Sequence, residues 1–148
     1  MKKMNNKGFS LVELIVVIAI MVVLVAVLAP VFTKYVEQSR RSTDVTNAQS
    51  IAESVLADVA DGAKDSSGND LIQDGQDTEV VAGTPTAILS DPTAKAKAYS
   101  GNKFQFRYDL ATNSVKVHVV GSDYDLTQID EAEAYKTDDT TVTGTYAK

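Results

Sequence analysis

A long apolar run near the start of the chain restricts its folding more than any other feature of the sequence. Between Phe9 and Thr33 the only charged residue is Glu13, and residues 14–32 are apolar apart from the break at Pro30. As an α-helix this stretch would be about 28 Å long, close to the ~30 Å hydrocarbon core of a bilayer. We therefore predict a membrane-spanning helix over residues 9–33, followed by a domain over residues 34–148.

The charges in front of the run predict its orientation. Three lysines precede it, namely Lys2, Lys3 and Lys7. Positive charge favours the cytoplasmic side, so the short head stays inside and the C-terminal bulk crosses the membrane. A cleaved secretory signal is the alternative. It fits poorly, because the run is longer than a signal core and its one small-residue cut site would leave Pro30 directly after the cut.

Composition excludes several kinds of site. The 148-residue chain has no cysteine, which excludes disulfides, thiolate metal sites and a thiol-linked lipid anchor. Residues 1–8 hold three of the 14 positive charges, so the remainder carries 11 positive against 20 negative charges, or −9. This acidic balance argues against nucleic-acid binding by the isolated domain. No phosphate loop, nucleophile elbow or paired-carboxylate pattern appears, so we expect no enzyme activity and no cofactor.

After residue 33 the apolar positions become one-sided. They recur at spacings of three and four, which places them on one stripe of a helix: Ala48, Ile51, Ala52, Val55, Leu56, Val59 and Ala60. Two oppositely charged pairs four residues apart, Glu37 with Arg41 and Arg40 with Asp44, are expected on the exposed face. Asp61-Gly62 is a common helix stop. One helix is therefore predicted from about residue 9 to about residue 60.

Residues 61–78 are rich in Asp, Gly and Ser and predict an exposed loop. The Asp spacing suggests calcium binding, but it does not match the alternating oxygen ligands that calcium requires, so solvated turns are expected and no metal site is predicted. Lone His118 has no other metal-ligating residue at ligand spacing, and it falls on the polar side of a predicted strand. We expect a surface histidine.

Beyond the loop the apolar period changes to two. Alternating residues are Phe104, Phe106, Tyr108 and Leu110, and after the turn Val115, Val117 and Val119. This pattern predicts a β-hairpin.

Weaker strand candidates are residues 79–82, 87–89 and 141–146, and residues 126–135 fit a short helix or a loop. The predicted fold class is α+β: a long N-terminal helix whose C-terminal half packs on a small antiparallel sheet.

The stretch K-G-F-S-L-V-E-L at residues 7–14, followed by the apolar run, closely resembles type IV pilins and related pseudopilins. The resemblance implies that a prepilin peptidase cuts between Gly8 and Phe9, removes residues 1–8 as a leader and methylates the new amine of Phe9. The apolar run would then be retained. Gly8 suits a protease site because it has no side chain.

Glu13 has two interpretations. Ser10 and Glu13 have the spacing of a capping box, in which Glu13 bonds back to the helix start. A carboxylate in lipid nevertheless costs about 3 kcal/mol on insertion scales. The resemblance implies an assembly role, in which the Phe9 ammonium of one subunit neutralises Glu13 of a neighbour. At Pro30 we expect a kink or local unwinding of the helix; many family members carry a glycine eight residues earlier, where this chain has Val22.

The predicted function is a structural subunit of a type IV pilus that polymerises with copies of itself. By resemblance its other partners are the prepilin peptidase, a membrane platform and an assembly ATPase. The precursor would be a single-pass protein of the cytoplasmic membrane, and the mature form an extracellular pilus used for adhesion, motility or DNA uptake. The alternatives are a pseudopilin of a secretion or competence system, or a membrane-anchored extracellular binding domain.

Overall fold

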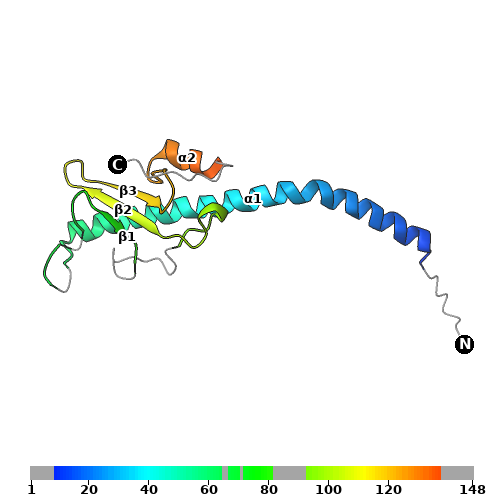
Figure 1. Ribbon diagram of the computed structural model, residues 1–148, viewed down its shortest axis with the longest axis horizontal. Coiled ribbons are helices and arrows are strands. Elements are labelled where there is room, and N and C mark those ends of the chain that lie inside the picture. The colour runs from blue at the N-terminus through cyan, green and yellow to red at the C-terminus, as the bar shows by residue number, and fades with distance from the viewer. Residues whose placement is uncertain (1–8, 65–66, 71, 82–92, 138–148) are drawn as a thin grey trace, which may run out of the picture. The chain divides into compact units, whose positions relative to one another are not determined.

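The computed structural model describes residues 9–64, 67–70, 72–81 and 93–137. In chain order these form α1 (Leu11–Ala60), β1 (Asp77–Glu79), the 3-10 turn η1 (Lys97–Tyr99), β2 (Phe104–Asp109), β3 (Ser114–Val119) and α2 (Ile129–Thr137) (Figure 1). The chain divides into two compact units, Met1–Val36 and Glu37–Lys148, so the boundary between them falls inside α1. The fold is α+β, as predicted.

The helix α1 begins two residues later than predicted and ends at the predicted residue. Ser10 stands at its N-cap: the backbone N–H of Leu14 donates to the Ser10 carbonyl at 3.2 Å, and the Ser10 N–H donates to Glu13 Oε2 at 3.2 Å. The second bond is the return half of the predicted capping box. At the other end, Gly62 adopts φ +64°, a left-handed conformation that ends helices readily because glycine has no Cβ.

Pro30 lies inside α1 without interrupting it. The Thr33 hydroxyl donates to the Pro30 carbonyl at 2.9 Å. Helix α1 is continuous at Pro30, and the kink or local unwinding expected there stays a prediction. Figure 1 shows the α1 ribbon bending within its apolar blue part, as a proline in a helix would produce.

The second unit has a three-stranded antiparallel sheet in the order β1-β2-β3. In the predicted hairpin Phe104 pairs with Val119, Phe106 with Val117 and Tyr108 with Val115, and all six side chains are buried. They share one core with residues of α1, namely Val45, Ala48, Ile51 and Val55. The period-two and period-3.6 patterns thus meet at a single apolar interface.

Several predicted boundaries shift. The strand β2 ends at Asp109, and Leu110 is 64% exposed because it belongs to the turn. Ala60, at the end of the predicted stripe, is exposed. The strand β1 overlaps the strand predicted over residues 79–82 only at Glu79, because it covers Asp77–Glu79 and ends there. The open choice over residues 126–135 resolves into α2.

Two other predicted strands, residues 87–89 and 141–146, lie outside the described residues.

Two charged residues that were predicted on the exposed face of α1 are buried instead. The guanidinium of Arg41 is 5.1 Å from the centre of the Tyr135 ring, its Nη1 donates to the Tyr135 carbonyl at 2.9 Å, and its Nε lies 3.3 Å from Glu37 Oε1. Asp44 accepts the N–H groups of Lys95 at 2.6 Å and Ala96 at 3.0 Å. The predicted surface pairing of Asp44 with Arg40 is therefore wrong, because these inward partners occupy the carboxylate.

The prediction of a surface histidine is also wrong. His118 is 2% exposed, and its Nε2 lies 3.2 Å from Oε1 of its cross-strand neighbour Gln105. Burial lowers the pKa of His118 below its ordinary value of 6.5, so the ring is neutral at pH 7. A neutral imidazole is buried at a lower cost than a charged one, which alternation along a strand does not reveal.

Candidate assembly surface and processing site

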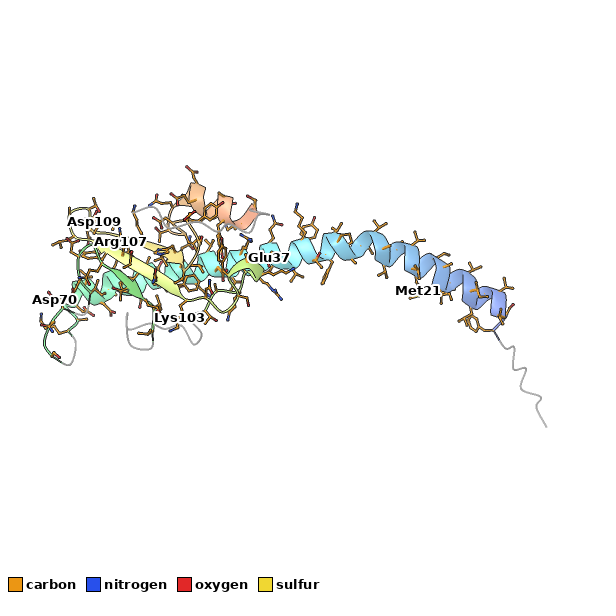
Figure 2. All side chains as sticks on the ribbon, in the orientation of Figure 1. Met21, Glu37, Asp70, Lys103, Arg107 and Asp109 are labelled. Carbon is orange, nitrogen blue, oxygen red and sulfur yellow. The ribbon has the colours of Figure 1, made fainter. Side chains whose placement is uncertain are left out.

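The first unit exposes a continuous apolar surface. Every large apolar side chain from Phe9 to Phe32 is between 47% and 85% exposed. The helix has one window with a mean hydropathy of 3.3 and none of that window is buried, so length and composition suit it to crossing a membrane. Figure 2 shows these side chains projecting all around the ribbon, with Met21 labelled among them. A helix that is apolar on all sides is stable when lipid or other helices surround it.

Glu13 is the only acidic residue among described residues 9–36. Its carboxylate lies at the first turn of α1, where the partial positive charge of the helix start favours it. The N–H that it accepts belongs to Ser10, one residue after Phe9. The structure therefore places Phe9 and Glu13 at the same end of the helix, with the Phe9 side chain 85% exposed. Gly8, the other residue of the predicted cleavage site, lies outside the described residues.

The resemblance-based roles of Gly8, Phe9 and Glu13 in cleavage, N-methylation and subunit assembly stay predictions. A single chain offers no partner subunit against which to test a charge pair. It does show that the capping role of Glu13 is compatible with its position, because the Ser10 N–H is already satisfied by Glu13 Oε2.

A buried polar network in the second unit was missed by sequence analysis. The Tyr135 hydroxyl donates to Asp44 Oδ2 at 2.8 Å, and both Glu37 oxygens accept the Lys97 N–H, at 2.8 and 3.0 Å. These bonds attach α2 and the segment around η1 to α1. A signal was present: Arg41 and Asp44 continue the stripe of Ala48, Ile51 and Val55 at spacings of three and four.

Burial of the network shifts two pKa values. Loss of water raises the pKa of Asp44 above 3.8, although the N–H groups of Lys95 and Ala96 act in the opposite direction. Burial, followed by the nearby Asp44 carboxylate, raises the pKa of Tyr135 far above its ordinary value of 10.0. The tyrosine is therefore a hydrogen-bond donor at every physiological pH, and the network is structural.

Metal binding has no support in the described part of the chain, where no three His, Cys, Asp or Glu side chains are placed to hold an ion. Only part of the Asp-rich loop is described, so its predicted lack of calcium stays a prediction. The loop residue Asp70 forms an ion pair with Lys64 at 2.6 Å.

Comparison with known proteins supports the N-terminal motif directly. Residues 3–29 match the family model described as the prokaryotic N-terminal methylation motif. Over 117 residues the chain is 28% identical to the type IV major fimbrial protein FimA of Dichelobacter nodosus, both from strain VCS1703A and from the species without a stated strain. The match covers 74% of this chain and 71% of the relative. No solved structure matches the chain.

The methylation motif coincides with the exposed apolar part of α1, and the similarity to FimA extends well beyond it into the second unit. Type IV pilins are structural proteins and not enzymes. Motif, helix and relative together support a type IV pilin-like protein, either a pilin or a pseudopilin.

Proposed function

We propose that this protein is the structural subunit of a type IV pilus. A prepilin peptidase cleaves it between Gly8 and Phe9 and methylates Phe9, and the mature chain polymerises into a helical surface filament. The precursor is held in the cytoplasmic membrane by α1. The peptidase, a membrane platform and an assembly ATPase are its transient partners.

One observation carries this proposal: the apolar side chains from Phe9 to Phe32 are exposed around the whole helix. Lipid satisfies this surface before assembly, and sister helices would satisfy it afterwards. A helix that served the domain alone would expose one polar face, as the later half of α1 does. An all-round apolar helix instead fits an element that exchanges lipid contacts for subunit contacts.

The charge of Glu13 gives that exchange its register. Cleavage creates an ammonium at Phe9, and a pair between this ammonium and Glu13 of a neighbour is favoured in a dry helix bundle over either charge alone. An uncut precursor has no such ammonium. This makes assembly depend on processing, since a subunit that keeps residues 1–8 would leave a neighbour's carboxylate without its counter-charge.

The similarity to a major fimbrial protein favours a pilus subunit over a pseudopilin. Filament length separates the two: long filaments on cells that express the protein are expected for the pilus, whereas short assemblies confined to the envelope would indicate the pseudopilin.

The decisive test of processing is mass spectrometry of the N-terminal peptide from filaments sheared off the cell surface. Methylated Phe9 should be the first residue. A peptide beginning at Met1 or Lys2 would contradict the proposal. Gly8→Val should block cleavage and keep full-length precursor in the membrane, while Asn6→Val, a matched change inside the leader, should leave cleavage intact.

A further inference from the structure

Arg40 is an exposed cation with no hydrogen bond or ion pair to any residue that the structure describes. The carboxylate four residues along the helix, Asp44, is fully buried and held by the N–H groups of Lys95 and Ala96. Arg40 instead lines a groove of about 540 Å³ between α1 and residues 93–101. Its wall also contains Lys95 and the hydroxyl residue Thr43, so the groove suits an anionic group.

At the opposite end of the second unit an acidic group lacks a cation, whereas at the first end a cation lacks an acidic group. The last turn of α1 contains no basic residue, although the helix macrodipole places partial negative charge there. Asp61 follows directly after the helix end, is exposed, and its carboxylate has no partner among the described residues. An acidic group at this position is unfavourable in an isolated subunit and would be stabilised by a cation from outside.

These two sites lie at opposite ends of the later half of α1. In Figure 2, Glu37 marks the end near Arg40, and Asp70, in the loop after α1, marks the other end. Two different complementary patches on one molecule form a heterologous contact, which propagates into an open helical filament when the rotation does not close. A second copy of this chain is thus the occupant that the charges favour.

We propose that Arg40 of one subunit forms an ion pair with Asp61 of another subunit in the same filament. The inference rests on the proposed polymerisation and adds to it a specific contact between the outer domains. The guanidinium can bind a carboxylate through two parallel N–H bonds, which fixes orientation as well as distance.

The pair sets a geometric requirement. Arg40 and Asp61 are separated by 21 positions in a chain that is helical up to Ala60. At 1.5 Å per residue, two parallel helices that bring these groups together must be staggered by roughly 30 Å along the filament axis. The stagger between neighbouring subunits in a filament reconstruction should therefore include this value.

Charge reversal and exchange test the pair in cells that assemble the wild-type protein. Arg40→Glu and Asp61→Lys should each lower the yield of sheared filaments by roughly tenfold or more, because like charges would face each other. The double variant, which exchanges the charges, should restore most of the yield. Glu53→Lys is the matched control, because Glu53 is an exposed, unpaired acid on the same helix, and its yield should stay unchanged.

The absence of cysteine permits a direct distance test. Co-expressed Arg40→Cys and Asp61→Cys subunits should form disulfide-linked dimers in filaments, and Arg40→Cys with Glu53→Cys should not. Circular dichroism and the amount of cleaved subunit in the membrane show whether each variant folds.

The outcomes separate the two proposals. If the wild-type protein forms no filaments, the proposed function fails. If it does form them, yet single reversals leave the yield unchanged, the exchange fails to rescue, or no cross-link appears, then the Arg40–Asp61 contact is wrong and the pilus function stands.

Discussion

Tyr135 and Asp44, 91 residues apart in the chain, share a buried hydrogen bond in which the tyrosine hydroxyl donates to Asp44 Oδ2 at 2.8 Å. The ring of Tyr135 stacks on the ring of Tyr99, with 5.9 Å between the ring centres. It also packs edge-on against the ring of Tyr124, with 5.8 Å between the ring centres. One side chain thus joins α2, η1 and α1. The second unit is held together by this polar contact as well as by the apolar core.

Replacing Tyr135 with Phe should lower the free energy of unfolding by about 1–2 kcal/mol, because Asp44 would lose one of its three donors while remaining buried. Urea unfolding of the full-length chain in detergent micelles, followed by the signal of the second unit, measures the loss. The Tyr35→Phe variant removes the hydroxyl of a tyrosine that is 67% exposed and should change stability by a smaller amount. Equal losses in the two variants would contradict the role of the Tyr135 hydroxyl.

Adjacent arginines on α1 should respond very differently to the same change. Arg41→Lys removes the planar group that lies over the Tyr135 ring and donates to the Tyr135 carbonyl, and should cost about 2 kcal/mol. Arg40→Lys changes an exposed, unpaired side chain and should stay within about 0.5 kcal/mol of wild type in the monomer. Urea unfolding of both monomeric variants measures the two changes in the free energy of unfolding. Similar losses would mean that burial of Arg41 is not what stabilises this region.

Asp125 bonds to the outer edge of β3, beside Leu126, whose N–H donates to the Val117 carbonyl at 2.8 Å. Its Oδ1 accepts the N–H of Val117 at 3.3 Å and both the N–H and the hydroxyl of Thr127, at 3.0 and 2.6 Å. Asp125→Ala should therefore destabilise the second unit by about 2–3 kcal/mol and expose an edge strand that can pair with other chains.

Hydrogen exchange gives a residue-level readout of this change. The amide of Val117 should exchange faster in Asp125→Ala, whereas the exposed neighbour Asp123→Ala should match wild type. Unchanged protection at Val117 would show that the side chain of Asp125 is dispensable for the edge.

His118 should make stability depend on pH. Its pKa is lowered from 6.5 by burial, so below that pH the unfolded chain binds more protons than the folded one. The free energy of unfolding should therefore fall as the pH drops from about 7.5 to about 5. In His118→Gln this decrease should be smaller, because glutamine does not titrate and can still bond with Gln105.

Urea unfolding at several pH values checks this prediction. Asp44 contributes with the opposite sign, since its raised pKa makes the folded state bind more protons above 3.8, and the difference between wild type and His118→Gln cancels that contribution. Parallel pH profiles for the two proteins would contradict the buried neutral histidine.

Glu13→Val should leave cleavage and membrane insertion intact and abolish filaments, because the Phe9 ammonium would have no counter-charge in the bundle. Immunoblotting separates precursor from mature subunit, and electron microscopy of sheared material measures filaments. Val12→Leu, a neutral change beside it, is the matched control. A normal filament yield from Glu13→Val would show that the charge pair is unnecessary and leave Glu13 with the helix-capping role alone.

Local patterns in the sequence determined most of the helix and strand assignments of this protein. The apolar run, the K-G-F-S-L-V-E-L motif, the long helix and the β2–β3 pairing are readable from the sequence, because each depends on residues a few positions apart or on one turn. The resemblance to type IV pilins and the fold class follow from these elements.

Only the tertiary structure decided which charged and polar side chains are buried. Arg41, Asp44 and His118 are polar residue types that were expected at the surface, yet each is buried. Besides Glu37, the partners of Arg41 and Asp44 are Lys95, Ala96 and Tyr135, each more than 50 residues away. A buried polar group is tolerated when distant groups supply its hydrogen bonds, and spacing along the chain carries no record of those groups. The same folding event left Arg40 without its expected partner and so available to another subunit.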